Sequence, residues 1–191
     1  MEELASIIVD CPHSTPKYDK GTTEYPCVRT TELRKGYIDW SPMKYVNKET
    51  YLERTKRLTP KEGDVMYGRE GTFGEAVRVP KDPKICLGQR VMLFRPNYSI
   101  CNSIFLWGLL RSRGIYFQAL RNTKGATVGH VNIRSIKKFK AFCPPLKLQE
   151  KFSNIVRKME NIRDYNRQSK RLIHNFSDVL MQKAFRGELK C

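Results

Sequence analysis

Positively charged side chains on predicted loops are the residues of this sequence best suited to binding a ligand. Lysine and arginine contact phosphate oxygens, and arginine also donates two parallel hydrogen bonds to guanine in the major groove. The loop from Asn122 to His130 adds asparagine, threonine and glycine, a mixture suited to approaching a groove of DNA. These properties select seven candidate contacts to nucleic acid: Lys17, Arg29, Arg34, Arg69, Arg90, Lys124 and Arg134.

Each candidate has an alternative interpretation as a solvated surface charge. Arg69 and Glu70 are adjacent and in that interpretation pair with each other. In the same interpretation, Arg90 stabilises a tight turn of the backbone. The sequence leaves these alternatives open.

The net charge supports a polyanionic partner. The 191 residues carry a formal charge of +17, with 26 Lys and Arg against 14 Asp and Glu in residues 1–147, or +12, and 10 against 5 afterwards, or +5. An excess of this size favours binding to nucleic acid, although an anionic membrane or solubility alone also explains it.

The sequence lacks the residue sets of common catalytic sites. It has no G-x-S-x-G or H-E-x-x-H motif and no acidic cluster suited to two metal ions. Cys143-Pro144-Pro145-Leu146 lacks the acid or amide and the aromatic residue of an amino-methyltransferase motif. Asp64 and Glu70 are better explained by a turn before a strand than by a nuclease site. We therefore expect a binding protein and not an enzyme.

The glycines of residues 68–74 are spaced three apart in Gly68-Arg69-Glu70-Gly71-Thr72-Phe73-Gly74. A phosphate-binding P-loop ends in Gly-Lys-Ser/Thr, and a dinucleotide-binding loop has another spacing. The pattern instead predicts a hairpin with positive φ angles or a close approach of backbone to a ligand.

The six cysteines and three histidines show no paired spacing, so neither a metal site nor a disulfide framework is predicted. No signal peptide and no apolar run of about 18 residues is present. We expect a cytoplasmic protein with reduced thiols, without cofactor or membrane association.

The hydrophobic pattern of residues 1–145 mixes predicted strands with helices. A short apolar run occupies residues 4–9. Short β-rich runs occupy residues 27–31, 65–67, 76–79, 85–95, 131–133 and 139–142, and helical patterns cover 47–57 and 103–120, the latter interrupted by Gly114. This indicates an α+β domain over residues 1–145, followed by a long helix over 146–185 and a tail over 186–191.

The long helix carries an apolar seam on a seven-residue grid. One column is Phe152, Met159, Asn166, Ile173 and Leu180, and the other is Leu148, Ile155, Ile162, Ser169 and Phe176. The alternating spacing of three and four places both columns on one face. The helix has a predicted length of roughly 55 Å, more than a core of this size needs, which favours a coiled coil over packing on its own domain. We expect Asn166 and Ser169 to set its register and orientation.

Several blocks, in order, resemble the specificity subunit of type I restriction-modification systems. They are residues 10–18, 28–33 with 36–39, 63–65 with 69–74, 87–91, and 132–149, followed by Ala184-Phe185-Arg186-Gly187-Glu188-Leu189. The resemblance implies a DNA target recognition domain and a spacer helix. In that family the domain reads one half of a bipartite site in double-stranded DNA. The resemblance further implies that the helix docks methyltransferase (M) subunits, which bind S-adenosylmethionine, and that the restriction (R) subunit joins through the complex. Such subunits usually carry two recognition domains and two helices, whereas this chain has one of each.

A half-length subunit with a self-complementary seam is expected to form an antiparallel homodimer through residues 148–182. Two other functions remain open at this stage. One is a non-specific single-stranded nucleic-acid-binding accessory protein that stacks bases on Tyr45, Tyr51, Tyr67 and Phe73. The other is an interaction scaffold whose charge serves solubility.

Overall fold

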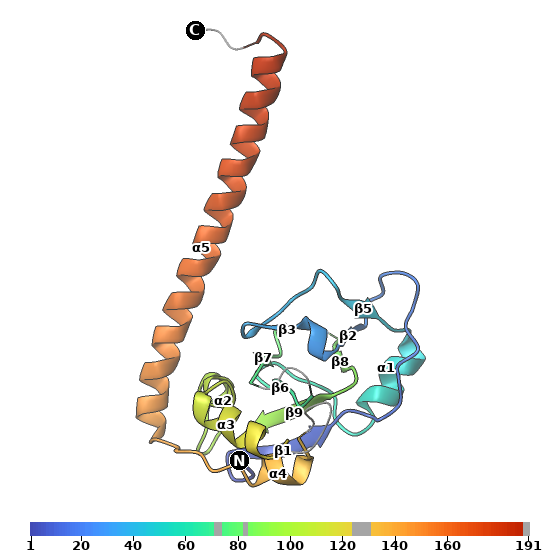
Figure 1. The fold of residues 1–191 in the computed structure, drawn as a ribbon, viewed down its shortest axis with the longest axis vertical. Coiled ribbons are helices and arrows are strands. Elements are labelled where there is room, and N and C mark those ends of the chain that lie inside the picture. The colour runs from blue at the N-terminus through green and yellow to red at the C-terminus, as the bar shows by residue number, and fades with distance from the viewer. Residues whose placement is uncertain (71–73, 82–83, 124–130, 189–191) are drawn as a thin grey trace. The chain divides into compact units, whose positions relative to one another are not determined.

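A four-stranded antiparallel sheet forms the centre of the fold in this computed structural model, which describes residues 1–70, 74–81, 84–123 and 131–188 (Figure 1). Its order is β1 (Ala5–Asp10), β9 (Val91–Pro96), β6 (Val65–Gly68) and β7 (Ala76–Arg78). The central strands β6 and β9 are almost entirely buried and consist mainly of Val, Met, Leu and aromatic residues, as strands covered on both faces require.

A smaller three-stranded sheet lies beside it in the order β5 (Lys44–Tyr45), β2 (Pro26–Val28) and β8 (Cys86–Leu87). After β2 the chain forms a 3₁₀ turn, η1 (Thr30–Glu32), and then a hairpin of β3 (Leu33–Arg34) and β4 (Tyr37–Ile38). Lys35 and Gly36 join these two strands with φ angles of 51° and 89°. Two central residues with positive φ make a turn whose twist matches that of the paired strands.

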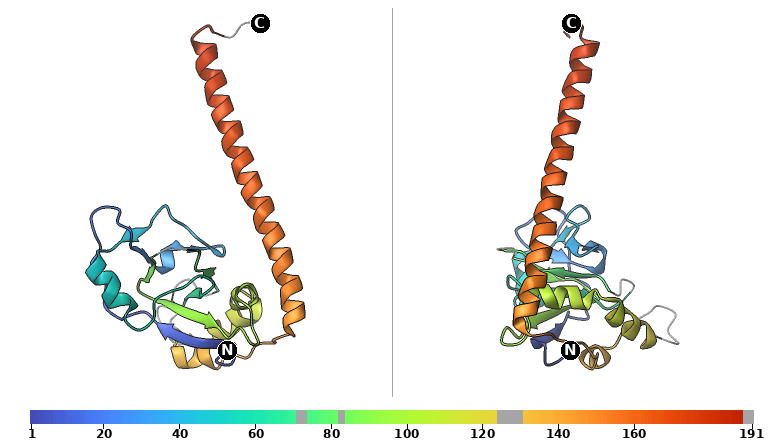
Figure 2. Two further views of the ribbon diagram at one scale, coloured as in Figure 1. Left: turned by 180° about the vertical axis from the view of Figure 1, so that it is seen from behind. Right: turned by 90° about the vertical axis from the view of Figure 1, so that its left-hand side faces the viewer.

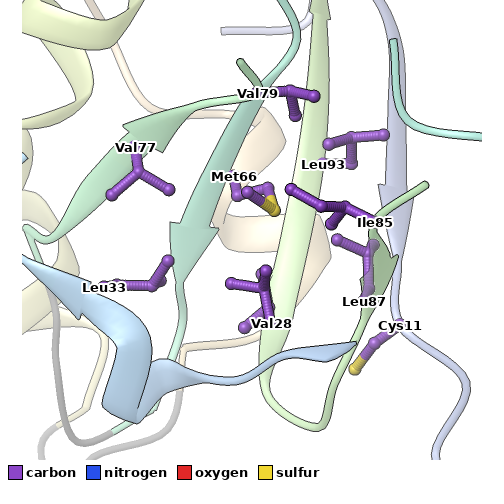
Figure 3. Close-up of a cluster of buried hydrophobic side chains, with 10 residues drawn as sticks. Cys11, Val28, Leu33, Met66, Val77, Val79, Ile85, Leu87 and Leu93 are labelled. Atoms are coloured by element: carbon purple, nitrogen blue, oxygen red, sulfur yellow. The ribbon is translucent and has the colours of Figure 1, made fainter. Parts of the chain in front are cut away.

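Residues from both sheets share one hydrophobic core (Figure 3). Val28 and Leu87 of the small sheet meet Met66, Val77 and Leu93 of the large one, and all are buried. Burial of this apolar surface holds the two sheets together, and it therefore fixes the positions of the loops between them.

Helices surround these sheets (Figure 2). α1 (Lys48–Thr55) packs against β8, and α2 (Ser103–Leu110) packs against β6, β7 and β9. The predicted helix over 103–120 is in fact two helices. The first ends with Arg111 as its C-cap. The Ser112 side chain then accepts a hydrogen bond from Ile115 N and so caps the start of α3 (Arg113–Arg121). Gly114 lies inside α3, so the predicted position of the break was wrong.

The predicted strand at residues 131–133 was also wrong. Asn132 caps a short helix, α4 (Ile133–Lys137), by accepting a hydrogen bond from Arg134 N. Side-chain capping of this kind competes with strand pairing in a segment too short to carry a clear period. Residues 139–142 form no strand either. The α+β class is confirmed.

α5 (Leu146–Phe185) is a continuous helix of 40 residues (Figure 1). The chain divides into two compact units, residues 1–150 and 151–191. Gln149, at the end of the first unit, is fully buried. Its side-chain oxygen accepts from Asn102 N at 2.9 Å, and its amide donates to the carbonyls of Ile100 (2.7 Å) and Pro144 (2.8 Å). Gln149 thus attaches the start of α5 to the loop before α2.

The apolar seam of α5 is uncovered in the single chain. Its eight apolar members are exposed by between 38% and 68%: Leu148, Phe152, Ile155, Met159, Ile162, Ile173, Phe176 and Leu180. In the part of the chain that the structure describes, no helix has both the length and the apolar character needed to cross a membrane.

Replacing Gln149 with leucine is expected to destabilise the first unit by about 1–3 kcal/mol, because Asn102 N–H and two carbonyls lose their partner in a buried place. Urea unfolding monitored by tryptophan fluorescence measures this. Gln168→Leu on the exposed surface of α5 is the matched control. Equal midpoints for the two variants would show that Gln149 does not hold the helix start.

Candidate nucleic-acid interface

Four of the seven predicted contact residues lie on the surface: Lys17, Arg34, Arg90 and Arg134 are exposed. Arg29 is half-buried and Arg69 is buried. Lys124, with most of its loop, lies outside the described residues. The candidates therefore separate into side chains available to a ligand and side chains already bound within the protein.

Arg69 has a structural partner. Its Nε donates to Asp10 Oδ1 at 2.9 Å, and the two side chains are only 6% and 4% exposed. The neighbouring Glu70 has a partner on the turn before β9, since its Oε2 lies 3.1 Å from Arg90 Nε. Successive residues in extended backbone point to opposite sides, so each of the two meets a different neighbour.

Arg29 also has bonds within the protein. Its backbone N–H donates to Glu32 Oε2 at 2.6 Å, its guanidinium pairs with the same carboxylate, and Nη2 donates to Pro42 O at 2.9 Å. Glu32 is fully buried. The pair closes η1, so we interpret Arg29 as a residue that shapes the loop.

The turn before β9 is held by backbone contacts on several sides. Arg90 has a φ of +66°, which is uncommon for a residue with a side chain. Its N–H donates to Cys11 Sγ (3.2 Å), and its carbonyl accepts from Arg69 N (3.1 Å). A Cβ on Gly88 would lie 2.8 Å from Val28 O, so the backbone approach there requires glycine. The turn therefore presents Gln89 and Arg90 from a rigid backbone.

The buried ion pair supports this turn from both sides. Asp10 ends β1 and Arg69 follows β6, the two strands that flank β9. Cys11 N also donates to Val91 O at 3.2 Å. Burial raises the pKa of the Cys11 thiol, and the neighbouring Asp10 carboxylate raises it further. The thiol thus stays protonated, as an acceptor for Arg90 N and a neutral part of the structure.

Arg54 is a structural residue that the sequence analysis did not identify. It is 4% exposed, and its guanidinium donates to the carbonyls of Leu87 (2.6 Å), Ser14 (3.1 Å) and Pro12 (3.4 Å). It joins the loop after β1 to the turn before β9, and it adds a buried positive charge behind both. Arg54 lies seven residues after the helix cap Asn47 and six after Lys48, the first residue of α1. No local sequence pattern at this position predicts its distant partners.

These loops enclose a small open cavity of about 270 Å³. Its lining residues are Cys11, Pro12, His13, Arg69, Glu70, Gln89 and Arg90. Gln89 donates to Thr15 Oγ1 at 2.8 Å, and the Arg90 side chain is 56% exposed. Gln89, which the sequence analysis did not select, has an amide suited to the adenine edge, and Arg90 has a guanidinium suited to guanine or phosphate.

A second surface lies at the β3–β4 hairpin. A depression of about 370 Å³ is lined by Thr30, Thr31, Leu33, Arg34, Lys35 and Glu75. Trp107 Nε1 donates to Gly36 O at 3.2 Å and to Ala76 O at 3.1 Å, which fixes the hairpin on the large sheet. Arg34 and Lys35 therefore project from a rigid turn. Neither depression is lined by Lys17 or Arg134.

Within the described ranges, no three side chains of His, Cys, Asp or Glu converge as a metal site would require. Two aromatic residues considered for base stacking have partners within the protein. Tyr67 is fully buried, and Tyr51 stacks on Tyr25 with ring centroids 4.6 Å apart. Phe73 lies outside the described residues.

Replacing Asp10 with asparagine is expected to lower the unfolding free energy by about 3–5 kcal/mol, because it leaves the Arg69 guanidinium buried without its counter-charge. Chemical denaturation measures the change. Glu24→Gln is the matched control, since Glu24 pairs with Lys84 at the surface with both side chains more than half exposed. It should leave the midpoint unchanged. Similar small effects of both substitutions would rule out a supporting role for the Asp10–Arg69 pair.

The chain is similar to known proteins over most of its length. Residues 4–175 match the model of the type I restriction modification DNA specificity domain. The type I restriction enzyme EcoBI specificity subunit of Escherichia coli is 24% identical over 169 residues, which cover 85% of this chain and 35% of that protein.

Solved structures share the fold. The HsdS subunit from Thermoanaerobacter tengcongensis superposes with a TM-score of 0.58 at 18% identity, covering 96% of this chain and 46% of that one. A chain from a structure described as the basis of complex assembly and conformational transition of the type I R-M system gives 0.56 at 18% identity, covering 96% and 47%. The chain thus spans between a third and half of the length of these relatives. Because the family model covers nearly all of it, this chain belongs to the family of type I restriction-modification DNA specificity domains.

Proposed function

We propose that this chain is a sequence-specific DNA-binding specificity subunit of a type I restriction-modification system. Its first unit reads one half of a bipartite site in double-stranded DNA. It directs an adenine methyltransferase subunit, which carries S-adenosylmethionine, and through the complex a restriction subunit. The family match over residues 4–175 carries the proposal.

The reading surface in this proposal is built from rigidly held loops. Arg90 and Gln89 are presented by the turn before β9, and Arg34 and Lys35 by the β3–β4 hairpin. Lys17 and, on α4, Arg134 are exposed and add further positive charge to the first unit. Lys124 lies outside the described residues and stays a candidate from the sequence alone. Rigid presentation suits base reading, because the cost of ordering the side chains on binding is then small.

The uncovered seam of α5 supports an antiparallel homodimer. In such a pair, each column of the seam faces the other column of the second copy. One register uses all ten seam positions. In this register, two residues face each other when their numbers add up to 328. Phe152 then faces the partner's Phe176, and Ile155 faces the partner's Ile173. The two polar positions, Asn166 and Ser169, face the partner's Ile162 and the partner's Met159. Every exposed apolar residue of the seam is covered in this register.

The homodimer reads two identical half-sites in inverted orientation, separated by the length of the paired helices. The alternative of a single-stranded nucleic-acid-binding accessory protein is less well supported, since Tyr67 is buried and Tyr51 already stacks on Tyr25.

Co-expression of the chain with its methyltransferase subunit, followed by mapping of methylated adenines, tests the specificity. We expect a bipartite motif with two identical, inverted halves. Methylation confined to a continuous asymmetric motif, or its absence, would contradict the proposal.

Two substitutions at Arg90 separate its possible contacts. If Arg90 reads a base, both Arg90→Gln and Arg90→Lys relax one position of the motif at about 1–3 kcal/mol, because lysine lacks the bidentate geometry. If it binds a phosphate, Arg90→Lys retains binding and Arg90→Gln lowers the salt dependence by about one unit per chain, or about two per dimer. Competition binding on variant duplexes measures both, with Arg186→Gln as control. Wild-type behaviour of both Arg90 variants would remove this turn from the interface.

Disulfide cross-linking tests the pairing of α5. We expect a chain with Ile155→Cys to cross-link to a chain with Ile173→Cys when the two are mixed, on a background with Cys143→Ser and Cys191→Ser. Each variant alone should not cross-link, because identical positions lie roughly 27 Å apart along an antiparallel pair. Cross-linking of either variant alone would indicate a parallel dimer, and no cross-linking in the mixture would reject this register.

A further inference from the structure

One face of α5 beside the seam carries a run of basic residues, here called the basic stripe. It consists of Arg163, Arg167, Lys170, Arg171 and His174, and with Asn166 these residues line an open groove of about 540 Å³. The opposite flank of the seam carries Lys151 and Lys158 in its first half, and beside the stripe it carries Tyr165, Leu172 and Val179, which are exposed and uncharged. The two flanks therefore differ in chemistry although they belong to the same helix.

The spacing of the stripe matches a helix face. Arg163, Arg167, Lys170 and His174 follow one another by three or four residues, which places them on successive turns of one side. From first to last they extend roughly 16 Å along the axis. The one acid between residues 163 and 174 is Asp164, whose Oδ1 lies 3.6 Å from Arg163 Nη2. Arg167, Lys170 and Arg171 thus leave a net positive charge on this face.

We propose that the basic stripe binds phosphates of the DNA between the two half-sites. This inference rests on the proposed function, and it assigns to α5 a second task beside setting the distance between recognition domains. The contacts are to the phosphate backbone and carry no sequence information, as a segment between half-sites requires.

In the antiparallel dimer, the two copies of the basic stripe form one longer basic surface. With opposing residues summing to 328, the two-fold axis passes near residue 164, so Arg163 lies close to the partner's Arg163. The flanks of antiparallel helices meet like with like, and both stripes therefore lie on the same side of the dimer. Together they extend roughly 30 Å between the two copies of His174. That length corresponds to about nine base pairs at 3.4 Å each.

The dimer interface leaves this charge without compensation. Across the basic flank, Lys170 lies near the partner's Val156, and Arg163 lies near its own copy. The apolar flank brings Lys158 near the partner's Leu172. Within the chain, His174 Nε2 lies 3.6 Å from Asp178 Oδ2. In this register neither flank brings an acidic residue of the second copy to Arg167, Lys170 or Arg171, so these three side chains favour an anionic partner. DNA between the two half-sites is a polyanion of matching length.

The test compares two triple variants of the full chain that remove equal charge. The stripe variant carries Arg167→Gln, Lys170→Gln and Arg171→Gln. The control carries Lys151→Gln, Lys158→Gln and Arg186→Gln, away from the stripe. Glutamine retains helix propensity close to that of lysine and arginine, so both should fold alike. Binding to a duplex bearing the mapped site is measured against salt concentration.

We expect the stripe variant to lower the salt dependence by roughly three to five units per dimer, since each phosphate contact contributes about 0.9. The control should change it by less than one unit, and the preference for the mapped site over a scrambled duplex should persist in both. Methylphosphonates in the middle of the spacer should weaken binding of the wild type and leave the stripe variant unaffected.

Equal salt dependence of the two variants would overturn the inference. Loss of co-purification with the methyltransferase subunit at unchanged DNA affinity would instead assign the stripe to an acidic protein surface, and would also overturn it. If the wild type itself shows no preference for the mapped duplex over the scrambled one, the proposed function fails, which is a distinguishable result.

Discussion

The buried ion pair between Asp10 and Arg69 is the interaction on which the turn before β9 and the loops beside it depend. It joins the end of β1 to the residue after β6, and so it passes over the start of β9, which lies between those strands. A buried ion pair contributes little net stability compared with apolar packing, but the loss of one partner is costly. Its role here is positional, since it holds the backbone on both sides of the turn that carries Gln89 and Arg90.

Other buried cations act in the same way. Arg54 reaches three carbonyls from two loops, and Arg29 closes η1 through Glu32. Part of the large positive charge of this chain is therefore used inside the domain to fix loops, and the remainder lies on the surface. A count of basic residues therefore overstates the positive charge at the surface, and among the seven candidates the exposed ones are Lys17, Arg34, Arg90 and Arg134.

α5 has a different physical constraint. Its seam leaves eight large apolar side chains in water, an arrangement that is unfavourable unless a second surface covers them. A self-complementary register covers them with a second copy, and the basic flank of that dimer then requires an anion. Assembly and DNA binding thus follow from two faces of the same helix in our proposals.

The sequence by itself determined the elements with a strong period. The ten-position seam predicted a helix over 146–185, and the structure has it as Leu146–Phe185. The α+β class followed from alternating runs, and the ordered blocks identified the family before any coordinates. The long helix follows from a local pattern, and the fold class and the family follow from many residues together. A wrong assignment of one short segment, such as residues 132–133, therefore did not change these predictions.

Only the tertiary structure decided which basic residues are available. Asp10 and Arg69 are 59 positions apart, and Arg54 meets carbonyls 33 to 42 positions away. No local pattern encodes such partners, because they depend on how the sheets pack. For the same reason Arg69 and Arg29, which look in sequence like Arg34 and Arg90, became structural residues. The packing of β1, β9 and β6 made that distinction.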